Sequence, residues 1–170
     1  VGENGLKELE TVCWVLDICN AKVNDSCGFH VHMDAASFNL DTWKNLALTY
    51  KHLEHLIDAF MPRTRRNNTY CKTLSGVSDE RIKSVRTIDG LREVFNNDRY
   101  HKVNFEAYSR HRTVEFRQHS GTTNFTKMEN WIRFLNGLIT FAKRSSLPSR
   151  MTLEELPFLD GKQKLFFKLR

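Results

Sequence analysis

The stretch Cys27-Gly-Phe-His-Val-His-Met-Asp34 is the best guide in the sequence to the fold. Apolar and polar residues alternate along it, which is typical of a β-strand with one buried face. His30 and His32 then share one face, and the apolar side chains share the other. The same alternation is common in antiparallel sheets whose outer face is simply solvated, so this strand alone also fits a structural role.

A second stretch, Thr113-Val-Glu-Phe-Arg-Gln-His119, has the same alternation. Here Glu115, Arg117 and His119 are expected to share a face, opposite two apolar residues. If both strands belong to one sheet and their polar faces align, they form a floor of histidines, a glutamate and an arginine. Such a floor suits a divalent metal and a phosphate group.

The rest of the chain is predicted to be mainly helical, with one more strand over residues 102–108 and a hairpin connection over 109–112. Helices of mixed and antiparallel sheets pack on one face, so we predict an α+β fold, formed as one domain over residues 1–170. The long predicted helices, with their expected N-caps, are 4–21 (Asn4), 41–60 (Asp41) and 126–144 (Thr126).

The composition limits the classes of partner that the chain is expected to bind. Its 170 residues have a net charge of +6, with 40% hydrophobic and 27% charged residues, which describes an ordinary soluble protein with a mild preference for anions. No apolar run is long enough for a membrane span, and the polar start lacks the apolar core of a signal peptide. The four cysteines form no C-x-x-C pair, which argues against a zinc ribbon. The chain is long enough not to need disulfides, so we expect a reducing, cytoplasmic setting. No recognition motif supports nucleic-acid binding.

The loop Arg63-Thr-Arg-Arg66 carries three guanidinium groups within four residues. Arginine forks match the oxygens of carboxylates and phosphates, so the loop suits an anionic ligand. A solvated basic loop explains the same residues, and both interpretations stay open.

Four stretches of the sequence together resemble the putative amidoligase family, whose members are carboxylate–amine ligases with a glutamine-synthetase-like fold, related to glutamate–cysteine ligase. The stretches follow the family's order and are Cys27–His32, Arg65–Cys71, Thr113–Thr122 and Trp131–Phe134.

The resemblance implies ATP-dependent formation of an amide or peptide bond. A carboxylate would attack the γ-phosphate of ATP, and an amine would then attack the acyl phosphate. The implied cofactors are ATP and Mg²⁺ or Mn²⁺, and the substrates are a small-molecule or peptide carboxylate and an amine. Arg66 and Arg117 resemble the catalytic arginines, with Arg66 on the substrate side or at a phosphate. A homo-oligomer stays open.

The same motif positions imply ligands for the metal and the nucleotide. His30 and Glu115 resemble metal ligands, whereas His32 resembles a contact to a nucleotide phosphate. Arg117 resembles the arginine that faces the transferring phosphate, and His119 is a further nucleotide-side candidate because it shares the predicted face of Glu115.

The sequence departs from the family pattern at one point: the closely spaced glutamates of an earlier strand have no counterpart. The chain then corresponds to the C-terminal part of the catalytic domain. Either a preceding segment or a partner chain completes the site, or the chain is a non-catalytic structural or assembly module derived from the family.

Overall fold

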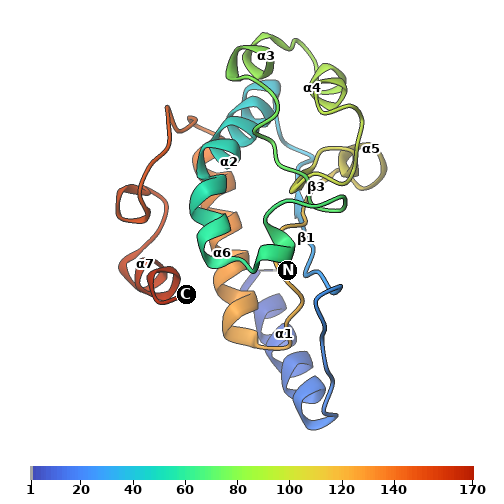
Figure 1. Cartoon of the computed structure of the whole chain (residues 1–170), viewed down its shortest axis with the longest axis vertical. Helices are drawn as coiled ribbons and strands as arrows, with labels where there is room; N and C mark the ends of the chain where they lie inside the picture. The colour runs from blue at the N-terminus through green and yellow to red at the C-terminus, as the bar shows by residue number, and fades with distance from the viewer. Residues whose placement is uncertain (1) are drawn as a thin grey trace.

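The computed structural model describes residues 2–170, which form helices packed around a small antiparallel sheet (Figure 1). This arrangement confirms the predicted α+β class. In chain order the elements are α1 (Gly2–Ile18), β1 (Val31–Asp34), α2 (Leu40–Phe60), a 3₁₀ turn (Arg63–Arg65), α3 (Asp79–Ser84), α4 (Ile88–Val94), β2 (Val103–Asn104), α5 (Ala107–His111), β3 (Thr113–Phe116), α6 (Phe125–Ala142), a second 3₁₀ turn (Leu153–Glu155) and α7 (Gly161–Lys168).

The sheet has β3 in the middle, with β1 and β2 paired to it in antiparallel orientation. His32 of β1 and Asn104 of β2 both lie opposite Glu115 of β3. The other face is apolar, and it joins the core that α2 and α6 cover. The core residues from the three strands are Val31, Val103, Val114 and Phe116.

The pairing of β1 with β3 slips by one residue just beyond β3. Val31 lies opposite Phe116, but Gly28 pairs with Ser120 instead of His119. One extra residue on the β3 side is therefore accommodated, as in a β-bulge, and the alternation of faces is broken there. The predicted shared face is wrong for His119, whose ring packs on Trp131 of the core.

The three long predicted helices are present. Helix α1 begins two residues before its predicted start, whereas α2 and α6 each begin one residue before theirs. Asn39 caps α2 by accepting a hydrogen bond from the Thr42 amide at 2.8 Å. Asn124 caps α6 by accepting one from the Lys127 amide at 3.0 Å. The predicted caps Asp41 and Thr126 are wrong because asparagine caps equally well and precedes both in the chain.

The predicted strand 102–108 is shorter than expected, and its predicted hairpin connection is wrong. The side chain of Asn104 accepts a hydrogen bond from the Glu106 amide, which turns the chain out of β2. Residues 107–111 then form α5 instead of extended backbone. Arg112 ends this helix with φ 57°, in the left-handed region, and leads into β3.

Helix α1 packs on α6 and projects beyond the other elements of the molecule (Figure 1). It ends at Ile18, three residues before its predicted end, and Asn20 follows in the left-handed conformation that terminates helices. Within α1 only Cys13 is buried, whereas the Trp14 side chain is 64% exposed. In the part of the chain that the structure describes, no helix has the length and apolarity required to cross a membrane.

Candidate functional site

The carboxylate of Glu115 is the centre of a polar cluster on the outer face of the sheet. Its Oε1 lies 2.8 Å from an Arg117 guanidinium nitrogen, 3.1 Å from His30 Nδ1 and 3.8 Å from His32 Nε2. Its Oε2 accepts a hydrogen bond from the Asn104 side-chain amide at 2.6 Å. The structure therefore brings together four of the predicted site residues and adds Asn104. We call these five residues the Glu115 cluster.

Glu115 is held in its ionised form. Burial raises the pKa of this carboxyl, but the hydrogen bonds from His30 and Asn104 and the charge of Arg117 outweigh burial and bring the pKa down to about 2. The side chain is only 8% exposed, so its charge acts where solvent screening is weak.

Arg117 keeps unused hydrogen-bonding capacity. Its guanidinium is buried beside Glu115, and its Nε has no hydrogen-bond partner among residues 2–170. A buried donor without a partner costs free energy, so such atoms are rare unless a ligand or water satisfies them. The orphan donor of Arg117 therefore indicates a place for an acceptor next to the cluster.

A cavity of about 410 Å³ opens beside the cluster, and Glu115, His32 and Asn104 form part of its wall. We call it the Glu115 pocket. The other side of the wall is basic because Arg92, Arg99, Arg110 and His111 line it as well.

The arginines of this pocket are not equally free. Arg92 is held by Glu106 at 2.5 Å and by Asp89 at 2.8 Å. Arg99 and Arg110 form no ion pair within the described chain, and so present uncompensated positive charge. A polyanion such as a triphosphate matches such a wall.

Arg65 stabilises the backbone that carries Arg117 of the cluster. Its buried guanidinium donates hydrogen bonds to the backbone carbonyls of Arg117 and Gln118, the two residues at the register slip. A Cβ added to Gly28 would lie 2.9 Å from this guanidinium and 2.7 Å from His30 Nε2. A side chain at this position would therefore require the imidazole of His30 and the guanidinium of Arg65 to move.

Two predicted site residues lie elsewhere. Arg66 donates from Nε to the Met61 carbonyl at 2.9 Å and lines a different cavity. His119 is buried between Phe29 and Trp131, with Nδ1 2.7 Å from the Ser120 carbonyl. Burial lowers its pKa to about 4, so the ring is neutral near pH 7. Their catalytic and nucleotide-side roles stay predictions.

A metal ion would need more ligands than residues 2–170 bring together. Among residues 2–170 no group of three or more histidine, cysteine, aspartate or glutamate side chains is arranged to hold a metal. His30 and Glu115 fit the cation only as partial ligands. Mg²⁺ is commonly held in this way, by one or two carboxylates together with substrate phosphates and water.

Comparison with protein families relates the chain to a known family. A family model described as putative amidoligase enzyme matches residues 2–139. The chain belongs to the putative amidoligase enzyme family. Comparison with curated proteins and with solved structures found no match. The family description supports a ligase, which is the coarser part of the predicted function.

The Glu115 cluster and the Glu115 pocket also contain residues that the sequence does not single out. The sequence offers a signal for Asn104, because it lies in the predicted strand 102–108, whose residues alternate between two faces. Arg110 lies in the predicted connection 109–112, and no periodic pattern singles out Arg110 or Arg99. Arg65 was counted within a solvent-facing or anion-binding loop, yet it binds backbone carbonyls instead.

Proposed function

We propose that this chain acts in ATP-dependent carboxylate–amine ligation. In the proposed reaction, a carboxylate oxygen forms a bond to the γ-phosphorus as the bond to ADP breaks. The amine nitrogen then attacks the acyl carbon, inorganic phosphate leaves, and the amine proton passes to solvent or a base. The observation that carries the proposal is the orphan donor of Arg117 beside ionised Glu115, whose carboxylate lines a basic pocket.

Each residue of the cluster has a proposed task. Arg117 binds the transferring phosphate, since a buried guanidinium stabilises negative charge strongly. Glu115 orients Arg117 through their 2.8 Å ion pair. His32, whose Nδ1 lies 2.8 Å from Thr113 Oγ1, is fixed in orientation and faces the phosphates from the pocket wall.

The basic wall of the Glu115 pocket would bind the other phosphates. Arg99 and Arg110 are the available cations there, and their proposed contacts do not require any existing ion pair to break. Mg²⁺ or Mn²⁺ would arrive with the nucleotide and neutralise phosphate charge, with His30 and Glu115 as its protein-side ligands.

The test is release of ADP by the chain in the presence of candidate carboxylates and hydroxylamine, which traps an acyl phosphate as a hydroxamate. We expect Glu115→Gln to lower turnover about a hundredfold or more, because Arg117 loses its orienting charge. Glu93→Gln, on the exposed side of α4, is the matched control and should leave turnover unchanged. Undiminished turnover in Glu115→Gln would contradict the proposal.

A further inference from the structure

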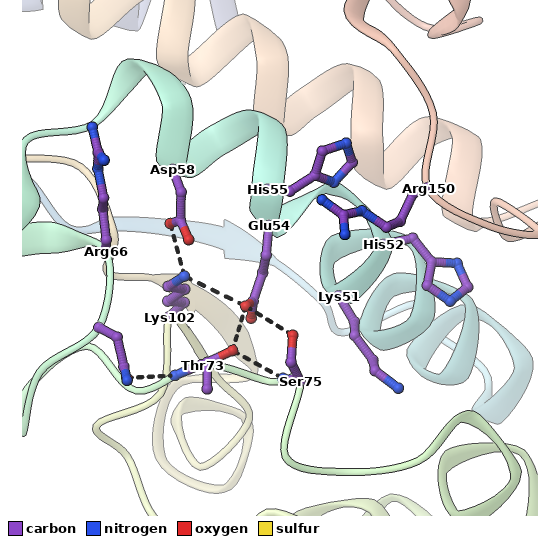
Figure 2. A pocket seen from close by; sticks show the side chains of 11 residues that line it. Lys51, His52, Glu54, His55, Asp58, Arg66, Thr73, Ser75, Lys102 and Arg150 are labelled. Carbon is purple, nitrogen blue, oxygen red and sulfur yellow. Dashed lines mark hydrogen bonds and ion pairs between the residues drawn. The ribbon is translucent and has the colours of Figure 1, made fainter.

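A second cavity, of about 420 Å³, lies between the C-terminal half of α2, the loop after Pro62 and Lys102 (Figure 2). We call it the Asp58 pocket, after the aspartate that faces it. It shares no lining residue with the Glu115 pocket. It is therefore a separate candidate for ligand binding.

The floor of the Asp58 pocket is a closed network of charges. Lys102 is fully buried, with Nζ 2.8 Å from Asp58 Oδ1 and 3.4 Å from Glu54 Oε2. Glu54 also accepts hydrogen bonds from the Leu74 amide and from the hydroxyls of Thr73 and Ser75. These groups satisfy one another, so the floor is fixed before any ligand arrives.

The sides of the pocket carry donors that remain available. Arg66 uses Nε for the Met61 carbonyl, but its terminal nitrogens have no protein partner within residues 2–170. Asn67 accepts a hydrogen bond from the Thr73 amide through Oδ1, and its NH₂ group has no hydrogen-bond partner among residues 2–170. Figure 2 shows Arg66 on one side of the floor and Arg150 on the other.

The charge balance of the lining favours an anion. Lys51 is already paired with Asp79 at 2.5 Å, so the remaining cations Arg66, Lys102 and Arg150 stand against the carboxylates of Glu54 and Asp58, and three against two leaves one net positive charge. Arg66 and Arg150 form no ion pair in the part of the chain that the structure describes, so each offers a guanidinium fork. Guanidinium forks bind carboxylate or phosphate oxygens in a bidentate manner.

We propose that the Asp58 pocket binds a small organic anion with two oxyanion groups, one held by Arg66 and Asn67 and the other by Arg150. A ligand with a single group would reach only one side, because the arginines stand across the floor from each other. Carboxylate and phosphate share this chemistry, and the test separates them.

The experiment is a site-resolved NMR titration of the intact chain with succinate, with pyrophosphate and with acetate. The signals to follow are the Nε–H of Arg66 and the side-chain NH₂ of Asn67, since pyrophosphate also has access to the Glu115 pocket. We expect saturable shifts with succinate or pyrophosphate, at least tenfold tighter than with acetate. The tighter of the two identifies the oxyanion.

Matched variants test the contacts. Arg66→Gln and Arg150→Gln should each weaken binding about tenfold, the loss expected for a charge-assisted hydrogen bond. Arg63→Gln removes an equal charge from an exposed position in the same loop and should bind like the unchanged chain. Glu115→Gln should bind the anion at the Asp58 pocket like the unchanged chain, so this test does not depend on the ligase proposal.

Two results would overturn the proposal. One is a linear, non-saturating shift with both succinate and pyrophosphate. The other is equal affinity in Arg66→Gln, Arg150→Gln and Arg63→Gln, while the spectra of all three show the native fold.

Discussion

The two halves of the segment Glu115–His119 differ in how completely their polar groups are satisfied. Toward the helices, Gln118 is fully buried, accepts a hydrogen bond from Tyr50 at 2.7 Å and donates one to Asp58 at 2.5 Å. Beside Glu115, Arg117 is also buried but keeps an orphan Nε. Trp131 Nε1 is unsatisfied as well, but it lies in the apolar core, whereas Arg117 lies in a polar cluster where an acceptor could bind.

The largest effect should come from Lys102, which pairs with Asp58, the residue that Gln118 also contacts. Replacing Lys102 with Met leaves Asp58 and Glu54 without their buried cation, so we expect a loss of about 3–5 kcal/mol in the free energy of unfolding. Urea denaturation measures this change. Lys83→Met, at an exposed position on α3, should change it by less than about 0.5 kcal/mol. Equal losses in both variants would refute the structural role of Lys102.

The two halves should also differ in their pH dependence. The folded-state pKa of His119, about 4, lies below the ordinary 6.5, so the unfolded chain binds a proton that the folded chain does not. Stability should therefore fall by about 3 kcal/mol as the pH drops from 6.5 to 4. The pKa of Glu115, about 2 against the ordinary 4.5, gives a loss of similar size between pH 4.5 and 2.

Thermal unfolding of two variants over pH 2–7 separates these windows. His119→Asn should flatten the upper window only, and Glu115→Gln the lower one only. If His119→Asn leaves the slope between pH 6.5 and 4 unchanged, the ring is not buried as described.

The register slip between the halves should be sensitive to small additions. Gly121 donates its amide to the Cys27 carbonyl, and a Cβ there would lie 2.5 Å from Cys27 Cβ. We expect Gly121→Ala to lower the free energy of unfolding by about 1–3 kcal/mol. Gly76→Ala meets nothing within 4 Å and serves as the control in the same denaturation experiment. Equal stability of both variants would contradict the close approach.

The smallest expected effect concerns Arg65, which links the two halves. Arg65→Lys keeps the charge but cannot reach both the Arg117 and the Gln118 carbonyl, so we expect a loss of about 1 kcal/mol. Arg63→Lys is the matched control. A chemical denaturation series that finds the same midpoint for both would show that the paired hydrogen bonds contribute nothing.

The sequence was informative wherever a simple period held. Alternation placed His32 and Glu115 on one face, and the helical period located α2 and α6. Alternation failed at His119 because one extra residue between Phe116 and Ser120 leaves no mark in the sequence pattern. The Arg63–Arg66 loop failed differently, since adjacent arginines of like chemistry go to different places: Arg65 to backbone carbonyls, Arg66 to the Asp58 pocket.

The most direct test of the central claim is a calorimetric titration with Mg-ATP of the unchanged chain, Glu115→Gln and Glu93→Gln. Saturable binding by the unchanged chain and by Glu93→Gln, with at least a tenfold weaker affinity in Glu115→Gln, is the result that a nucleotide site at the Glu115 cluster predicts. Equal affinity in all three proteins, or no binding by the unchanged chain, would contradict it.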